Sequence, residues 1–258
     1  MPEERRLHPG ASAQSLRQDP QARTARALLE GVREAGELKA AALSVGDDLE
    51  VSTRLDGPVG EAPLLVFGHG AGAGIDHPTT VAIAEALAAR GIAVLRYQFP
   101  FMEKQGGSGF GRDPRPVAMA TVVAAVARGR QLSGDARVFA GGHSYGGRMT
   151  THAAAEGGLG ELAGLVLLSF PLHGARKPAT ERAAHLSSVK QPMLFVSGER
   201  DAMAEAPAFE ACVSELEVAE IVRIPGADHG WKAPKRVWPD GPIAAVADAV
   251  VAWVGERA

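Results

Sequence analysis

The sequence predicts an α/β protein in which a mostly parallel, twisted sheet of about eight strands carries helices on both faces. From residue 64 onward, short runs rich in Val, Leu and Ile alternate with segments whose apolar residues recur at helical spacing. Several of these runs are apolar throughout, as expected of parallel strands that helices cover on both faces. One hairpin signal, at residues 38–55, precedes this alternation.

Length and composition fit one domain. The chain has 258 residues, which suits one sizeable α/β domain, and it shows no internal repeats and no second domain. Its hydrophobic fraction of 46% and charged fraction of 22% are typical of a soluble globular protein. The net charge of −3 indicates no general basic surface for nucleic acid. We therefore expect a small-molecule substrate and no nucleic-acid partner.

The cysteine content and the lengths of the apolar runs predict where in the cell the protein is located. The single cysteine excludes an intrachain disulfide and a cysteine-rich zinc site, and it fits a reducing environment. No apolar run approaches the roughly 18 residues of a membrane span, and Arg5-Arg6 precedes no apolar segment of a signal peptide. No cluster has the spacing of metal ligands. We expect a cytoplasmic protein with no membrane partner, no metal and no cofactor.

The first 37 residues differ from the rest. Residues 1–20 are polar and Arg-rich, which predicts a poorly ordered tail. Residues 21–38 carry apolar side chains at helical spacing, which predicts either a helix docked on the domain or an arm for self-association in a homodimer. We therefore divide the chain into residues 1–37, a tail with a short helix, and residues 38–258, the folded domain.

The strands are recognised as short apolar runs that end at glycine or polar residues. The first two are separated by Gly46-Asp47-Asp48, which is a hairpin signal. Strands are expected at residues 38–45, 49–55, 64–67, 92–96, 137–142, 165–168, 193–196 and 221–224.

The helices lie between these strands. We expect Asp76 to cap a helix that ends before Gly91 and Asp240 to cap the last helix, through Val254. Further helices are expected at residues 117–131, 144–156 and 207–216. Residues 100–116 are predicted as a loop, and the interval from 170 to 193 holds at most one short helix, at 180–186. An interval of roughly twenty residues is too short for a cap domain with its own core.

One short motif organises the chemistry. Gly142-His143-Ser144-Tyr145-Gly146 follows an apolar strand and has the pattern G-x-S-x-G. A serine at a sharp strand-to-helix turn sits in a strained backbone conformation, with its hydroxyl directed out of the sheet. The strand and the helix pass closely, so the flanking positions must be small. Ser144 is therefore the candidate nucleophile.

The other candidate residues follow other strands, at the edge where parallel sheets bind ligands. A serine hydroxyl needs a base, and an imidazole needs a partner that fixes its tautomer. His229 is the candidate base, and Asp201 is preferred over Glu199 and Asp228 as its partner. The backbone amides of Ala71 and Tyr145 are candidates for an oxyanion hole.

Further residues near the same strand ends are candidates for contact with a substrate. His69 is also interpreted as a structural hydrogen-bonding residue, and His173 either borders the site or belongs only to its loop. The candidates are His69, Gly70, Met102, His143, His173 and Trp231.

Several segments resemble a known family. The sequence resembles the α/β-hydrolase superfamily over nearly all of residues 38–257. More narrowly, the runs at residues 67–78, 96–102 and 169–173 resemble small, dienelactone-hydrolase-like proteins. This branch includes bacterial hydrolases and animal testis-expressed and acetyltransferase-complex homologues. The resemblance implies an α/β-hydrolase fold with Ser144, Asp201 and His229 as the triad. Dienelactone hydrolases themselves use a cysteine where this chain has Ser144, which argues against that substrate.

The expected function is hydrolysis by a serine nucleophile. We expect a carboxylesterase that acts on small or short-acyl substrates through an acyl-enzyme intermediate. The same three side chains would serve a peptidase or a thioesterase. A binding or scaffold protein with little turnover is the alternative from a different class, because a fold does not determine a function.

Overall fold

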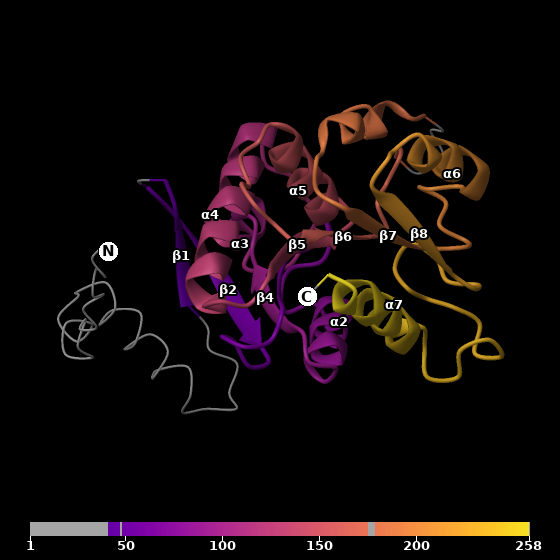
Figure 1. Ribbon diagram of the computed structural model, residues 1–258, viewed down its shortest axis with the longest axis horizontal. Helices are drawn as coiled ribbons and strands as arrows, with labels where there is room; N and C mark the ends of the chain where they lie inside the picture. Colours follow the sequence, from indigo (N-terminus) through magenta and orange to yellow (C-terminus); the bar gives the residue numbers. More distant parts are fainter. Residues whose placement is uncertain (1–40, 47, 175–178, 258) are drawn as a thin grey trace, which may run out of the picture. The chain divides into compact units, whose positions relative to one another are not determined.

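The computed structural model describes residues 41–46, 48–174 and 179–257. The predicted tail and helix at 1–37 lie outside the described residues. One eight-stranded sheet has the order β1-β2-β4-β3-β5-β6-β7-β8 (Figure 1). The β1–β2 and β2–β4 pairs are antiparallel and the other pairs are parallel, which confirms the predicted sheet. The strands are β1 (Ala41–Val45), β2 (Leu49–Asp56), β3 (Leu64–Gly68), β4 (Ala93–Tyr97), β5 (Val138–His143), β6 (Gly164–Leu168), β7 (Met193–Gly198) and β8 (Ala219–Ile224).

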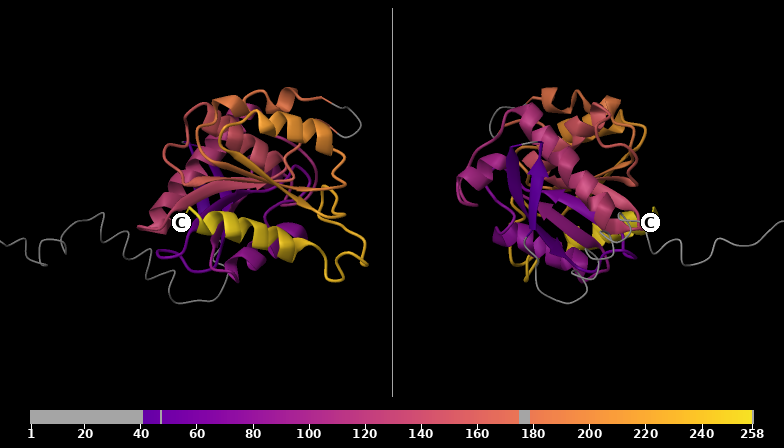
Figure 2. Two further views of the ribbon diagram at one scale, coloured as in Figure 1. Left: turned by 45° about the vertical axis from the view of Figure 1, so that its right-hand side comes forward. Right: turned by 90° about the vertical axis from the view of Figure 1, so that its left-hand side faces the viewer.

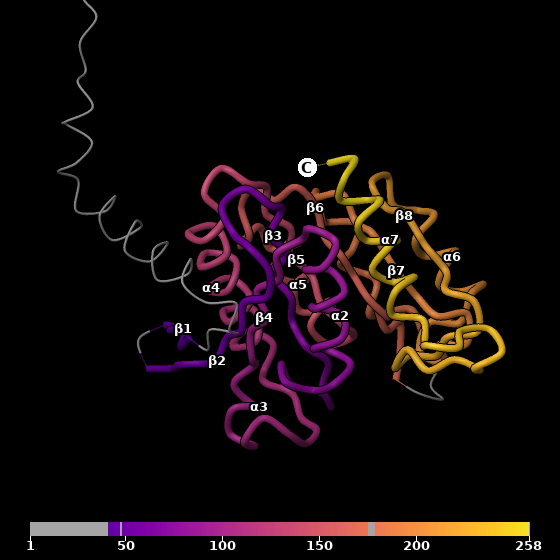
Figure 3. Tube along the Cα trace, turned by 90° about the horizontal axis from the view of Figure 1, so that it is seen from below, coloured from indigo at the N-terminus to yellow at the C-terminus, as the bar shows by residue number. Residues whose placement is uncertain are grey.

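Helices cover the sheet on both sides. They are α2 (Pro78–Ala88), α3 (Pro100–Lys104), α4 (Arg115–Ser133), α5 (Tyr145–Ala155), α6 (Ala206–Ser214) and α7 (Ile243–Gly255). Helices α4, α5 and α6 lie on one face, and α2 and α7 lie on the other (Figures 1 and 2). From below, α2 and α7 run side by side across the strands (Figure 3).

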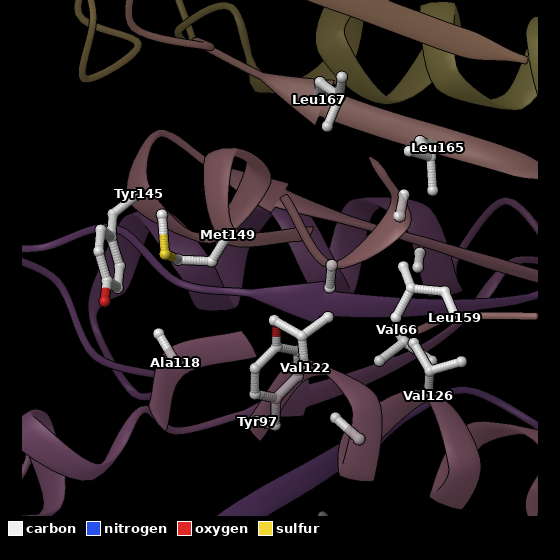
Figure 4. Packing of buried hydrophobic residues seen from close by; sticks show 14 of the residues in the cluster. Val66, Tyr97, Ala118, Val122, Val126, Tyr145, Met149, Leu159, Leu165 and Leu167 are labelled. Carbon is white, nitrogen blue, oxygen red and sulfur yellow. The ribbon is translucent and has the colours of Figure 1, made fainter. Parts of the chain in front are cut away.

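The apolar strands divide their side chains between two cores. In β3, Leu64 and Val66 point toward α4 and α5, whereas Leu65 and Phe67 point toward α2 and α7. This alternation follows from the period of two along a strand, and it explains why a strand covered on both faces is apolar throughout. Figure 4 shows Val66 beside Val122 and Val126 of α4, within the first of these cores.

Two predicted helix caps are wrong. The side chain of His77, not that of Asp76, accepts the hydrogen bond from the Thr79 amide, at 3.2 Å. Asp76 instead forms an ion pair with Arg54 at 2.9 Å. At the start of α7 the capping position is Pro242 rather than Asp240, and no side chain caps that helix. Capping propensity alone does not decide between Asp76 and His77, because the ion pair with Arg54 occupies the Asp76 carboxylate.

Two loops contain more structure than the sequence predicts. The segment expected as a loop from residue 100 begins with the short helix α3, which buries Phe101 and Met102. Pro100 stands in its first turn, where a missing N–H has no cost. The single helix expected at 180–186 is instead a pair of 3₁₀ helices, η2 (Glu181–Ala183) and η3 (Leu186–Ser188). Between β6 and β7, the described residues contain no further element, which agrees with the absence of a cap domain.

A buried ion pair fixes the loop after β3. Arg96 of β4 binds Asp56 of β2 through two hydrogen bonds, of 2.7 and 2.9 Å, and both side chains are almost fully buried. The same guanidinium donates to the carbonyl of Ile75, and the side chain of Gln98 accepts a hydrogen bond from the Ile75 amide at 2.9 Å. The far end of the loop is therefore tied to the sheet by a charged group that has every partner it needs.

Three backbones cross where β3, β5 and α5 meet. A Cβ at Gly142 or at Gly146 would overlap the carbonyl oxygen of Gly68, and Gly142 also has a φ of 158°. The overlap is with backbone, which cannot rotate away as a side chain can. Glycine at these two positions is therefore a steric requirement of the turn that carries Ser144.

We predict that Gly146→Ala destabilises the domain by more than about 2 kcal/mol, because it forces a methyl group into packed backbone. The matched control is Gly255→Ala at the end of α7, where an added Cβ would contact nothing within 4 Å. Urea unfolding measures both variants. Equal unfolding midpoints for the two would contradict the steric argument.

Candidate active site

The turn at Ser144 has the strained geometry that the motif predicts. Ser144 joins β5 to α5 with φ 52° and ψ −107°, in the left-handed region that side chains disfavour. Its amide donates to the carbonyl of Leu168 at 2.8 Å, and its carbonyl accepts from the Arg148 amide at 3.1 Å. Hydrogen bonds on both sides hold this conformation, so Ser144 stays at the carboxyl edge of the sheet.

Three side chains from three strand ends form one hydrogen-bonded chain. The hydroxyl of Ser144 lies 2.9 Å from Nε2 of His229. Nδ1 of the same ring lies 2.9 and 3.0 Å from the two carboxylate oxygens of Asp201. The imidazole is partly exposed, whereas the carboxylate is buried, with 2% of Asp201 exposed. The structure therefore brings together the three residues that the sequence selects.

The two competing acids are engaged elsewhere. Glu199 accepts a hydrogen bond from the Gly226 amide at 2.8 Å. Asp228 accepts from two amides of its own loop, at 3.0 and 2.8 Å. Asp201 also accepts from the Met203 amide, at 2.8 Å, which holds the carboxylate toward the imidazole. Of the three candidate acids, Asp201 is the one in contact with His229.

The candidate oxyanion donors lie at the two loops beside Ser144. Tyr145 is the first residue of α5, and Ala71 belongs to the loop after β3. Among residues 41–46, 48–174 and 179–257, neither amide donates a hydrogen bond. The Ala71 carbonyl accepts from the Gly111 amide at 3.1 Å, which orients the peptide groups of this loop. One of these amides follows Ser144 directly and the other lies in the loop after β3, and both keep the free N–H that an oxyanion would need.

His69 has the structural, hydrogen-bonding position that one interpretation of the sequence predicts, and its prediction as a substrate contact is wrong. The ring is fully buried, and Nε2 accepts from the Phe99 amide at 2.9 Å. The proton is therefore on Nδ1, which donates to the Gly70 carbonyl at 2.7 Å. Burial lowers the pKa of His69 to about 4, so the ring stays neutral. It joins the loop after β3 to the segment after β4.

The other predicted pocket residues also lie deeper than expected. Met102 is fully buried in the core, so its prediction as a substrate contact is also wrong. Gly70 is buried as well, and its carbonyl is used by His69. His173 and Trp231 are each 4% exposed, and Nδ1 of His173 bonds the carbonyl of Gly174 at 2.8 Å. Helix α3 buries what the sequence suggested to be an open loop, and this accounts for Met102.

His143 connects the turn to the loop that carries His229. Its Nε2 lies 2.9 Å from the His229 carbonyl, and the two ring centroids are 5.4 Å apart. Burial, together with the nearby His229, lowers the pKa of His143 to about 4. A neutral ring donates Nε2–H to that carbonyl, so His143 holds the backbone of the residue that faces Ser144.

Sequence reasoning missed Asp113. Its backbone carbonyl accepts from the Tyr145 hydroxyl at 3.4 Å, and its carboxylate accepts from the Phe101 amide at 3.2 Å. Burial raises the pKa of Tyr145 to about 12, so the phenol remains a donor. These contacts join α3 and the segment before α4 to the turn at Ser144. These hydrogen bonds join residues that are distant in sequence and lie in different segments, so no local sequence pattern could have predicted them.

Two kinds of feature are absent from the described residues. These residues contain no group of three or more His, Cys, Asp or Glu side chains placed to hold a metal ion. In the same part of the chain, no helix is both long enough and apolar enough to cross a bilayer.

Comparison with known proteins identifies the family. Residues 61–255 match the family described as "Alpha/beta hydrolase domain". Esterase Est1E from Butyrivibrio proteoclasticus has a TM-score of 0.65 at 20% identity, covering 84% of this chain and 98% of that one. A dienelactone hydrolase from Anabaena variabilis has a TM-score of 0.66 at 22% identity, with coverages of 86% and 98%. XC6422 from Xanthomonas campestris, an α/β serine hydrolase without a lid, has a TM-score of 0.64 at 22% identity, with coverages of 85% and 96%.

The protein belongs to the α/β-hydrolase family, because the match covers most of the chain. The predicted fold class is confirmed, and so is the resemblance to dienelactone-hydrolase-like proteins. Membership of the family supports hydrolase activity. At 20–22% identity, these three structures share the fold with this chain, and a fold does not determine a substrate.

We predict that acid destabilises the fold partly through His69. The unfolded ring has a pKa of 6.5 and the folded ring one of about 4, so the unfolded state binds more protons between these values. Stability therefore falls as the pH drops from about 6.5 to 4, by up to about 1.4 kcal/mol per pH unit from this one group. His69→Gln should be less stable at pH 7 but have a flatter pH dependence, measured by urea unfolding at several pH values. Parallel curves for the two proteins would contradict the assignment.

Proposed function

We propose that the protein is a serine hydrolase that cleaves carboxylic esters through an acyl-enzyme intermediate. The observation that carries the proposal is the unbroken chain from the Ser144 hydroxyl through His229 to the buried Asp201. Each member has the partner that its chemical task requires. The chain ends at the carboxyl edge of the sheet, where ligands bind to open parallel sheets.

In the acylation step, Nε2 of His229 takes the hydroxyl proton while Oγ of Ser144 attacks the ester carbonyl. The carbonyl oxygen becomes an oxyanion, and the amides of Ala71 and Tyr145 are the donors we assign to it. When the tetrahedral intermediate collapses, the imidazolium gives its proton to the departing alcohol. The acyl group then remains bound to Oγ.

In the deacylation step, water replaces the alcohol. His229 takes a proton from this water, the hydroxide attacks the acyl carbonyl, and the second tetrahedral intermediate releases the carboxylic acid. The proton then returns to Oγ of Ser144. Throughout, the carboxylate of Asp201 accepts from Nδ1, which keeps the lone pair of Nε2 toward Ser144 and stabilises the imidazolium.

A preference for small or short-acyl substrates is part of the proposal. The segment between β6 and β7 contributes two 3₁₀ helices to the described structure rather than a cap with its own core. A long acyl chain gains about 0.8 kcal/mol per methylene only where that methylene is buried. We therefore expect the specificity constant to be highest for acyl chains of about two to six carbons.

The test of the proposal is covalent labelling. A fluorophosphonate probe should modify Ser144, as located by peptide mapping, and Ser144→Ala should remain folded and lose about 10⁶-fold in kcat on 4-nitrophenyl acetate. The same series extended to laurate measures acyl preference. An adduct at Ser108 or Ser197 would refute the assignment of the nucleophile. A folded protein with no adduct and no turnover would favour the binding or scaffold alternative.

We predict that Asp201→Asn lowers kcat/KM by about 10⁴-fold, because an amide cannot hold the required tautomer of His229. The matched controls are Glu199→Gln and Asp228→Asn, whose carboxylates bond backbone amides instead. These two variants should stay within about threefold of the parent protein. A larger loss from Glu199→Gln than from Asp201→Asn would mean that the wrong carboxylate is assigned.

A further inference from the structure

Four arginines gather near the turn that carries Ser144. They come from three separate segments. Arg112 precedes α4 and Arg115 begins it, Arg148 lies in α5, and Arg182 lies in η2. The element η3, close behind η2 in the chain, packs on α5. The charges therefore meet through the fold and not through a sequence run, which is why no motif reveals them.

Arg148 is the member closest to Ser144 along the chain. It lies one helical turn after Ser144, and its amide bonds the Ser144 carbonyl at 3.1 Å. Its side chain is half-buried, and its Nε is buried without a hydrogen-bond partner among the described residues. A buried N–H of a charged group without an acceptor is costly, so this guanidinium favours the approach of an acceptor.

Arg182 lies close to the loop after β6, which is hydrogen-bonded to the segment that carries Asp201. Its Nη2 is 3.7 Å from the position that a Cβ of Gly174 would occupy. The preceding residue, His173, donates its amide to the carbonyl of Met203 at 3.4 Å, and Met203 is bonded to Asp201. The guanidinium of Arg182 is thus beside the loop that borders the Ser144–His229–Asp201 chain.

The charges of neighbouring arginines act on Arg148 and on Arg182. Burial, and then the positive charges of Arg182 and Arg112, lower the pKa of Arg148. Burial, and then Arg112, lower the pKa of Arg182. Like charges repel one another, and an oxyanion bound among the arginines would relieve that repulsion.

In the part of the chain that the structure describes, none of the four arginines forms an ion pair with a carboxylate. The carboxylate of Asp113, which follows Arg112 in sequence, accepts instead from the Phe101 amide. Two histidines beside the group, His152 and His185, stack with their ring centroids 3.6 Å apart. Burial and the nearby arginines lower the pKa of His152 to about 4. Burial, His152 and the arginines lower the pKa of His185 to about 4. Both rings are therefore neutral at pH 7 and add no further positive charge to the group.

We propose that Arg148, Arg182 and Arg112 bind an oxyanion on the substrate, so that the ester carries a carboxylate or phosphate in addition to its scissile bond. This proposal rests on the proposed function, since it assigns the substrate class of that same site. A guanidinium presents paired N–H donors that match both oxyanions, and several converging guanidinia favour a charged group over a neutral one. A neutral ester would leave the repulsion among the arginines in place.

The test compares matched esters that differ in one charge. Phenol release is measured from 4-acetoxybenzoate and its methyl ester, with 4-acetoxyphenyl phosphate as a third substrate. For an anion on the acyl side, 4-nitrophenyl hydrogen glutarate is compared with its methyl ester. We expect kcat/KM to be about 10- to 100-fold higher for the anionic member of at least one pair. The phosphate arm distinguishes the two oxyanions.

The variants test which residues are responsible. Arg148→Gln, Arg182→Gln and Arg112→Gln should each reduce the anionic-to-neutral ratio of kcat/KM several-fold, and Arg148→Lys should restore part of it. Arg112 is exposed, so its variant guards against a loss of folding at the half-buried positions. The matched control is Arg128→Gln on α4, which removes the same charge where the side chain contacts Gln131 at 3.3 Å. A ratio near one in both pairs, or a ratio that none of the three arginine variants changes, would overturn the proposal.

A binding measurement separates this proposal from the proposed function. Ser144→Ala protein is titrated with 4-hydroxybenzoate and with inorganic phosphate by NMR, and adding Arg148→Gln should weaken binding of at least one of them about tenfold or more. Binding that depends on Arg148 without fluorophosphonate labelling of Ser144 would support the anion site and refute the serine hydrolase. Hydrolysis of neutral and anionic esters at equal rates would support the serine hydrolase and refute the anion site.

Discussion

The arrangement of this protein depends on one steric constraint, the contact of three backbones at Gly68, Gly142 and Gly146. Strand β3, strand β5 and helix α5 approach so closely there that no side chain fits between them. This contact forces the abrupt reversal at Ser144 and holds it in the left-handed region of backbone space. The position of the hydroxyl is therefore a consequence of backbone packing in the centre of the sheet.

The parts around Ser144 are connected by hydrogen bonds that run between loops and not within them. His143 holds the carbonyl of His229, and His69 bridges the segments after β3 and β4. The Tyr145 hydroxyl reaches the segment before α4. These three links involve neutral donors and acceptors. The charged parts of the framework are the buried carboxylate of Asp201, the buried pair of Arg96 and Asp56, and the arginine group.

Sequence reasoning predicts the fold well where the pattern is local and repetitive. The apolar runs identify β3 to β8, because most of these strands are buried on both faces, and the hairpin signal identifies β1 and β2. The chain order of Ser144, Asp201 and His229 is predicted because each follows a strand. The same reasoning fails for Met102 and for the substrate contact expected of His69, because the burial of both depends on a helix, α3, within a glycine-rich and charged segment. It also fails for Arg148, since side chains from distant loops decide its surroundings.

The buried pair of Arg96 and Asp56 has a consequence for recognition. Because Arg96 also binds the carbonyl of Ile75, the loop that carries Ala71 is anchored at its far end to two strands. A ligand that meets the Ala71 amide finds a donor whose orientation is settled before binding. The conformational entropy of ordering that loop is lost during folding, so association does not have to overcome it. Affinity at this position should therefore depend on the fit of the ligand and little on induced rearrangement.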